Sequence, residues 1–396
     1  MKIVLITINT PASENVGGTS ALPYHLLVKR PSDVEVVVYS FNYNNLKAEK
    51  IAKVEKELNL KIHLLNKPEN VMNMLNSKIG IIQRIFSLYP LYYYTKLHDT
   101  EVQQIKSEMP NGVWIYGEEL SQVSKQFAEF KRVHCFPDSE SLYYKRMMEQ
   151  SFVKASMGLY IRQWLMYPKF VRMEQSMDNS SNIYYYLVGD ADVQNFKQLN
   201  PKVNALFIRH PHYGVSHRDL TDSTVKLKLL IAGRYDLYMK QDADLMVEAL
   251  LRCKNLQEHY VITILGKGWE AVVVKLQRVG YDVHYVTFAM DYIEEIRKHD
   301  IQVVPISIGT GTKGKVLDAL SNGLLVIGTW FAMENIAVES GKSCIEYHSA
   351  EELMEVLATI PNDWQRYKAM AEAGRQAVLT EHAKEKCSKE MFDLFR

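Results

Sequence analysis

The sequence has few cysteines, no excess of either charge and no long apolar run. Only four cysteines occur among 396 residues, and they form no CxxC pair or Cys/His cluster. This argues against a disulfide framework or a structural zinc site and fits a reducing cytoplasm. Lys and Arg number 47 against 46 Asp and Glu, without the basic excess of a nucleic-acid-binding protein. No stretch reaches the ~18 apolar residues of a membrane span.

A dinucleotide fingerprint is also absent. The first apolar run, residues 3–8, is followed by Gly17 and Gly18 but not by GxGxxG, and the next run ends in Ser40 instead of an acid. Both features disfavour nicotinamide or flavin chemistry. We therefore expect no cofactor and no metal.

What the sequence does contain is a regular alternation of strand-length apolar runs and helical patterns. A chain of this length usually forms two domains, and the alternation is typical of βαβ units and parallel sheets. The fold class predicted is α/β, with two tandem Rossmann-like doubly wound domains. The alternation lapses in residues 209–224, which are rich in His, Gly, Ser and Asp. We expect domains at 1–212 and 227–380, with a linker at 213–226.

Three segments have less regular patterns. Residues 139–177 predict one long helical stretch, and a short helix is expected near 335–340. Residues 79–97 are the most apolar and aromatic outside the predicted strands. Their aromatic and basic residues suit a membrane surface, but their length favours a core helix pair kinked at Pro90.

Three histidines, His210, His212 and His217, cluster in the predicted linker. They lack the i, i+4 spacing and the partner carboxylates of a familiar zinc motif. We interpret them as surface histidines of the linker.

The densest chemistry lies in residues 305–329. A strand at 301–306 runs into a turn made of Gly309, Thr310, Gly311 and Thr312, and a helix is predicted from Lys313 to Ser321. Glycines allow close backbone approach, and the helix N-terminus attracts anions. Lys313 and Lys315 add positive charge, so a phosphate or diphosphate is the expected ligand. A common strand-to-helix turn with solvated lysines is the alternative.

The sequence resembles the GT-B glycosyltransferases, and within them the large retaining group that uses nucleotide-sugar donors (glycosyl transferases group 1). The motifs that carry the resemblance are Gly17-Gly18, IRHPHYGV, IAGRYDLYMKQDADLMVEAL, LGKGWE, and the segment from VTFAMDYIEEIRKHD to SNGLLVIGT. The resemblance implies two domains facing a cleft, with the donor bound mainly by the second. It also implies that residues 381–396 form a helix that packs back on the first domain.

Donor-binding roles follow from the same resemblance. It implies that Arg234 and Lys240 neutralise the donor diphosphate and that Asp318 hydrogen-bonds the ribose. Gly266 occupies the G-x-G turn of the group. Thr310 stands where the group has a glutamate that contacts the sugar, and Lys313 is expected to take part of the phosphate binding, beside Gly311 and Thr312.

Catalytic residues are expected at the strand ends of the first domain. If an acid or base assists, the candidates are Asp138, Glu118 and His134, although capping or surface roles are equally compatible with them. Fixed N–H dipoles with Arg and Lys stabilise a leaving diphosphate without a metal.

The resulting expectation is a cytoplasmic, retaining hexosyltransferase that uses a UDP- or GDP-linked donor. Its acceptor would be a glycan or a lipid-linked molecule of polysaccharide biosynthesis, with peripheral contact at the inner face of the membrane. A nucleotide-sugar epimerase of the same fold and a non-catalytic nucleotide-sugar-binding protein are the alternatives.

Overall fold

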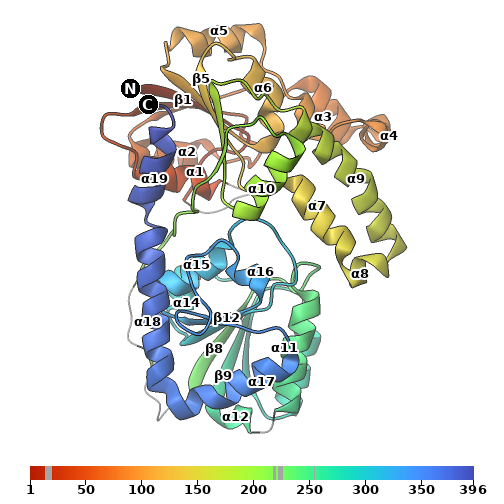
Figure 1. The fold of residues 1–396 in the computed structure, drawn as a ribbon, viewed down its shortest axis with the longest axis vertical. Coiled ribbons are helices and arrows are strands. Elements are labelled where there is room, and N and C mark those ends of the chain that lie inside the picture. The colour runs from red at the N-terminus through yellow and green to blue at the C-terminus, as the bar shows by residue number, and fades with distance from the viewer. Residues whose placement is uncertain (14–19, 217–219, 222–225, 254) are drawn as a thin grey trace. The chain divides into compact units, whose positions relative to one another are not determined.

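The computed structural model describes residues 1–13, 20–216, 220–221, 226–253 and 255–396. Contacts divide the chain into two compact units, each built around its own sheet (Figure 1). The first unit comprises Met1–Pro211 together with Lys384–Arg396, and the second comprises His212–Ala383. The described residues of the expected linker belong by their contacts to the second unit.

The first unit contains a seven-stranded sheet in which every neighbouring pair is parallel. Its central strand, β1, is buried along nearly its whole length because its side chains are apolar on both faces. The strand order is β3-β2-β1-β4-β5-β6-β7. The strands are β1 (Lys2–Thr7), β2 (Glu35–Ser40), β3 (Lys61–Leu64), β4 (Gly112–Tyr116), β5 (Lys131–Cys135), β6 (Ile183–Leu187) and β7 (Ala205–Phe207).

Helices cover both faces of this sheet. The expected helical stretch over residues 139–177 is confirmed, but Gln150 and Ser156 have extended backbones that divide it into α7, α8 and α9. The helices of this unit are α1 (Ala21–Val28), α2 (Ala48–Leu58), α3 (Glu69–Asn76), α4 (Lys78–Phe86), α5 (Asp99–Ser107), α6 (Ser121–Lys125), α7 (Glu140–Glu149), α8 (Ser151–Lys154), α9 (Met157–Gln175), α10 (Asp190–Leu199) and α19 (Lys384–Asp393), with short 3-10 helices η1 (Leu91–Tyr94) and η2 (Glu118–Leu120).

Helix α19 packs into the core of the first unit although it lies far away in sequence. Cys387, Met391 and Phe392 are fully buried there. The ring of Phe392 meets Trp114 edge to face at 5.8 Å, and the Ser388 hydroxyl donates to the carbonyl of Leu26 at 2.9 Å. The first unit therefore needs residues 384–396 to complete its core.

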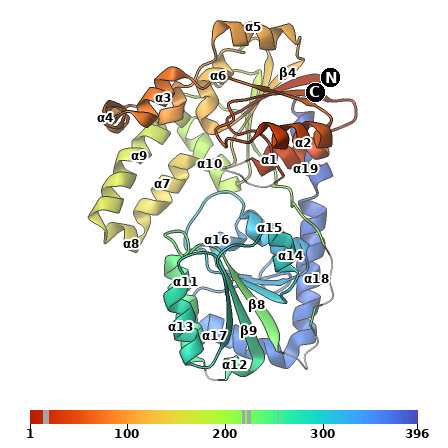
Figure 2. The same ribbon diagram turned by 180° about the vertical axis from the view of Figure 1, so that it is seen from behind.

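The second unit contains a six-stranded parallel sheet with the order β10-β9-β8-β11-β12-β13. In Figure 2, α11 and α13 lie on one side of β8 and β9, and α14 and α18 lie on the other. This is the doubly wound arrangement that the sequence predicts. The strands are β8 (Leu227–Ala232), β9 (Tyr260–Leu265), β10 (Asp282–Val286), β11 (Ile301–Val304), β12 (Leu325–Gly328) and β13 (Ile345–Glu346).

The helices of the second unit follow the predicted pattern except near residues 335–340. The short helix there is α16, which begins earlier because the Thr329 hydroxyl accepts from the backbone N–H of Ala332. Asn335 has a φ of +68°, which stops a right-handed helix. The helices are α11 (Lys240–Arg252), α12 (Leu256–His259), α13 (Glu270–Arg278), α14 (Tyr292–Ile296), α15 (Gly314–Ser321), α16 (Trp330–Met333), α17 (Ala350–Thr359) and α18 (Trp364–Glu381), with η3 (Ile360–Asp363).

Residues 79–97 do not form the core helix pair that their composition favours. Helix α4 ends at Phe86, before Pro90, and leaves five large apolar side chains exposed. Tyr93 packs into one core cluster and Leu97 into another. No helix in the described part of the chain is both long and apolar enough to span a bilayer.

Candidate functional site

Two glycine turns touch at the carboxyl ends of β8 and β9. Gly233 and Gly266 both have a φ of +138°, and a Cβ added to Gly266 would lie 2.1 Å from the carbonyl oxygen of Gly233. That carbonyl also accepts a hydrogen bond from the buried Trp269 indole at 2.8 Å. Only glycine fits this contact. The pair therefore forms a wall of bare backbone at the sheet edge where α/β proteins bind ligands.

Lys315, the second residue of α15, is directed at this wall. A Cβ on Gly233 would lie 2.7 Å from the Lys315 Nζ, and Nζ donates to the carbonyl of Ala232 at 3.3 Å. Burial lowers the pKa of Lys315 to about 8, opposed by Asp236 and reinforced by Lys313. A partly desolvated ammonium held by a backbone carbonyl and the Met239 sulfur is an arrangement suited to an anionic group.

The glycine turn before α15 has the predicted strand, turn and helix order, but Lys313 folds back onto it. Its Nζ donates to the carbonyls of Thr310 at 2.6 Å and Gly311 at 3.0 Å. Gly311 has a φ of +59°, and Asn335 also donates to its carbonyl. Thr310, Thr312 and Lys313 are half-buried. The Lys313 ammonium therefore fixes the shape of the turn, in addition to any contact with a ligand.

Asp318 is buried on α15, three residues after Lys315 and so on the same face of the helix. Its charge contributes, after burial, to the raised pKa values of the Tyr213 and Tyr292 hydroxyls. The structure thus places Asp318 beside two phenol groups, where the sequence alone suggests only a ribose ligand.

Arg234 and Lys240, the expected basic pair, have different surroundings. Arg234 follows Gly233 directly and is exposed. Lys240 begins α11, where its Nζ contacts the Asp244 carboxylate at 2.9 Å and the Tyr235 hydroxyl at 3.3 Å. The Asp244 hydrogen bond raises the pKa of Lys240. Lys240 therefore has a carboxylate partner of its own, whereas Arg234 extends from the glycine wall.

Two of the three acid–base candidates in the first unit are enclosed by protein. His134 is fully buried on β5, and its Nε2 donates to the Gly117 carbonyl at 2.8 Å. Burial lowers the pKa of His134 to about 4, so the imidazole is neutral at pH 7. Glu118 is buried in η2. Asp138, which follows β5, is half-buried and is the most accessible of the three.

Glu118 faces carboxylates that the sequence does not single out. Burial, with the nearby charge of Glu174, raises the pKa of Glu118 well above its usual range, and burial raises the pKa of Glu174. Glu174 also accepts from the Ser141 N–H at 2.9 Å and the Ser139 hydroxyl at 3.0 Å. Glu174 thereby anchors the start of α7, and burial favours the protonated form of both carboxyls.

The carboxyl pair predicts a pH dependence of stability in the first unit. A carboxyl whose pKa is raised by folding stabilises the fold at low pH and loses that contribution as pH rises through the folded pKa. Burial also raises the pKa of Glu140 to about 8, which extends this loss of stability to about pH 8. We expect thermal melts followed by circular dichroism to show lower stability at pH 8.5 than at pH 5.5. Glu118→Gln should reduce the difference by on the order of 1 kcal/mol.

The matched control is Glu49→Gln, which removes an exposed carboxyl of α2 and should leave the difference between the two pH values unchanged. Equal melting temperatures of the parent protein at pH 5.5 and 8.5 would contradict the raised pKa values of these carboxyls.

Other sequence-based expectations have mixed outcomes. Gly17, Gly18 and His217 lie outside the described residues. His210 is buried, not a surface histidine, and burial lowers its pKa to about 4. Among the residues that the structure describes, no group of three or more His, Cys, Asp or Glu side chains could hold a metal ion.

Residues 226–363 match the family described as Glycosyl transferases group 1. The match covers most of the second unit, which extends from His212 to Ala383. The matched region includes the Gly233–Gly266 wall, Arg234, Lys315 and Asp318. No curated protein sequence matches the chain.

Solved structures similar to this one extend the comparison to both units. The Anabaena protein Alr3699/HepE in complex with UDP aligns with a TM-score of 0.66 and 13% identity, covering 99% of each chain. Sucrose-phosphate synthase from Thermosynechococcus elongatus aligns with a TM-score of 0.64 and 12% identity, covering 100% of this chain and 98% of the other. WaaG, a glycosyltransferase involved in lipopolysaccharide biosynthesis, aligns with a TM-score of 0.60 and 15% identity, covering 99% of each chain. The predicted GT-B fold is confirmed, and its second Rossmann-like unit contains the region that the group 1 family matches.

Proposed function

We propose that this protein is a retaining glycosyltransferase that moves a sugar from a UDP- or GDP-linked donor to a glycan or lipid-linked acceptor. The observation that carries the proposal is the Lys315 ammonium beside the Gly233–Gly266 wall, inside the matched region. A nucleotide diphosphate suits this place because Lys315 and the exposed Arg234 can neutralise its charge. The UDP and UDP-glucose complexes of the Anabaena protein support a nucleotide-sugar donor.

The roles of the remaining residues follow from this placement. Arg234 and Lys315 bind the diphosphate, Asp318 accepts from a ribose hydroxyl, and the turn at Thr310 and Gly311 borders the sugar. As the acceptor hydroxyl attacks the anomeric carbon, the bond from that carbon to the diphosphate breaks and the charge on the leaving oxygen grows. Arg234 and Lys315 stabilise that charge without a metal.

The acceptor loses a proton during transfer, and the leaving diphosphate can take it. Among the first unit's candidates, Asp138 is the one we propose for assistance, since His134 and Glu118 are enclosed. Cytoplasmic location and a role in polysaccharide biosynthesis belong to the same proposal.

A thermal-shift panel of UDP, UDP-sugars and GDP-sugars tests the donor. A ligand at about 100 times its Kd stabilises the folded state by ~2.7 kcal/mol, which should raise Tm by several degrees. Arg234→Ala should give a smaller shift. Lys275→Ala, which removes an exposed lysine of α13, is the control and should match the parent. Lys313→Ala should lower Tm without ligand, because it opens the turn.

Product analysis separates the classes of function. Release of nucleotide diphosphate only when an acceptor is present indicates a transferase, whereas an altered sugar formed from donor alone indicates an epimerase. Donor binding with no product in any combination indicates a binding protein. Absence of stabilisation by every nucleotide sugar would refute the donor site itself.

A further inference from the structure

Helix α9 carries a stripe of apolar side chains on its exposed face. Five apolar side chains recur at positions i, i+3, i+4, i+7 and i+8, which places them on one face of the helix. In a soluble helix such a face packs on the core, yet here all five are exposed. They are Met157, Tyr160, Ile161, Trp164 and Leu165. The side chains of α9 that are buried instead include the polar Gln163 and Lys169. The stripe therefore faces a medium other than the protein's own core.

Helix α4 adds exposed apolar side chains beside this stripe. Its Ile81 and Ile85 side chains are exposed and line one pocket with Ile161 and Leu165 of α9. Phe86, at the end of α4, is 80% exposed. Lys169 of α9 holds α4 in place by donating to the carbonyls of Arg84 at 2.5 Å and Ile85 at 3.0 Å, at the negative end of the helix dipole. A buried lysine used in this way fixes the two helices as one surface, which we call the α4–α9 face.

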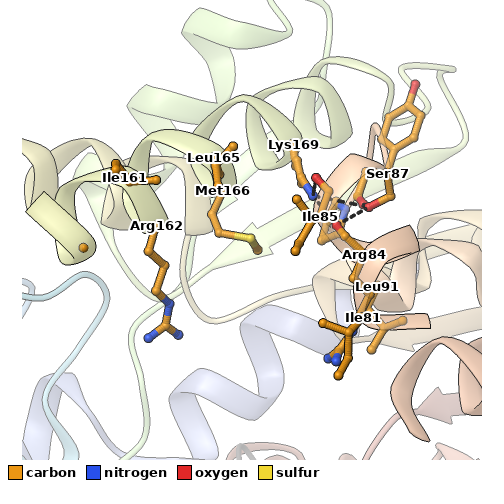
Figure 3. A pocket seen from close by; sticks show the side chains of 13 residues that line it. Ile81, Arg84, Ile85, Ser87, Leu91, Ile161, Arg162, Leu165, Met166 and Lys169 are labelled. Atoms are coloured by element: carbon orange, nitrogen blue, oxygen red, sulfur yellow. Dashed lines mark hydrogen bonds between the residues drawn. The ribbon is translucent and has the colours of Figure 1, made fainter. Parts of the chain in front are cut away.

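A pocket opens between the two helices. It has a volume of about 440 Å³. In Figure 3, Ile81, Ile85 and Leu91 line it from one side and Ile161, Leu165 and Met166 from the other. Arg84, Arg162 and Lys169 supply the cationic groups among the lining residues. An apolar pocket with cationic groups fits an acyl chain below an anionic head group.

The charge of these segments points to the same partner. Residues 70–98 contain Lys78, Arg84 and Lys96, and residues 150–173 contain Lys154, Arg162, Lys169 and Arg172, and neither segment contains an Asp or Glu. Apart from Lys169, which is buried against α4, six positive charges thus lie in two segments of a chain whose net charge is +1, so the remainder is negative. Segregated positive charge beside exposed apolar and aromatic side chains matches an anionic bilayer surface.

We propose that the α4–α9 face docks on a bilayer of anionic phospholipids. Its apolar stripe would enter the head-group boundary, while Lys78, Lys154 and Arg162 contact lipid phosphates. The chain would then sit on the membrane without spanning it. None of these side chains belongs to the second unit, so the docking face and the proposed donor site can be tested separately.

Co-sedimentation of the full chain with vesicles tests the proposal. Vesicles of phosphatidylcholine mixed with phosphatidylglycerol should bind the protein at least tenfold more strongly than vesicles of phosphatidylcholine alone, and added salt should weaken the binding. Phe86→Glu combined with Trp164→Glu should lower binding to the mixed vesicles at least tenfold, because both side chains are exposed and would carry charge into the apolar layer. Arg162→Glu should have a smaller effect in the same direction.

The chain offers matched controls. Phe288→Glu replaces a phenylalanine that is 72% exposed in the second unit, and Arg278→Glu reverses an exposed charge on α13. Both should bind vesicles like the parent. All variants should show the same rise in melting temperature with UDP as the parent. If UDP raises the melting temperature of none of the proteins, the proposed donor site is refuted, while the proposal for the docking face is unaffected.

Two results would overturn the proposal. One is absence of binding to the mixed vesicles, or equal loss of binding in the control variants. The other is a dimer in light scattering that Phe86→Glu with Trp164→Glu dissociates, without vesicle binding, since a second copy would then cover the α4–α9 face.

Discussion

Lys315→Met is expected to make the second unit more stable and to weaken UDP-sugar binding about 100-fold. Folding lowers the pKa of Lys315 to about 8, so the folded state is penalised wherever the amine is charged in both states, which is below about pH 8. Methionine has a similar length and no charge, and should raise the free energy of unfolding by on the order of 2 kcal/mol there. The gain should shrink as pH rises from 8 towards 10.

The loss of binding has the opposite cause. A diphosphate beside Lys315 supplies the counter-charge that the free protein lacks, and a charge-assisted hydrogen bond of this kind contributes roughly 2–3 kcal/mol. In the parent, affinity should decline above about pH 8 as Lys315 loses its proton, whereas the variant should not show this decline.

Calorimetric titration with UDP at several pH values, with denaturant unfolding in parallel, measures both effects. Lys275→Met, on the exposed surface of α13, is the control for loss of a positive charge. A Lys315→Met protein that is stabilised but binds UDP like the parent would place the diphosphate elsewhere.

Among substitutions that add one methyl group to the second unit, Gly266→Ala is expected to lower its stability the most. The new Cβ would lie 2.1 Å from the Gly233 carbonyl oxygen and 3.3 Å from the Arg234 nitrogen, and both atoms belong to backbone that cannot rotate away. The φ of +138° adds strain for any residue with a Cβ. Together these should lower the free energy of unfolding by about 3 kcal/mol or more.

The change should also displace Arg234 and thereby abolish donor binding in whatever fraction remains folded. Gly314→Ala is the control, because a Cβ there meets no atom within 4 Å and alanine favours a helix. It should leave stability equal or slightly raised in the same unfolding experiment. Similar losses for both variants would show that the contact between the two glycine turns has no special weight.

The sequence predicts the fold well because its signals are local. Apolar runs such as residues 3–8 identify buried parallel strands, and the glycines before α15 identify a turn that opens a helix. The break of the 139–177 helix at Gln150 and Ser156 is not visible in this way, since neither residue type prevents a helix and tertiary packing decides their backbone angles.

The direction of a long side chain depends on tertiary neighbours, so the sequence could not rank the two lysines of the turn. The position of Lys313 in the sequence predicts a phosphate ligand, yet its ammonium donates to the carbonyls of its own loop. Lys315 reaches Gly233, which lies more than 80 residues earlier. The sequence does not predict that Glu174 lies near Glu118 for the same reason, because only folding brings the two residues together.

The composition of residues 79–97 also led to a wrong prediction, that of a buried helix pair. An apolar, aromatic segment reads as core, since burial is the commonest outcome for such side chains. Only the exposure of α4 and the outward stripe of α9, taken together, show that these apolar side chains face outward.

The return of α19 to the first sheet affects the order in which the two units can fold during synthesis. Residues 212–383 form a continuous unit, whereas the first unit lacks Cys387, Met391 and Phe392 until residues 384–396 have left the ribosome. N-terminal domains usually fold first during synthesis. Here the second unit can finish folding before the first. The second unit can be complete while the sheet of the first unit still exposes the apolar surface around Trp114, so a chaperone would matter most in that interval.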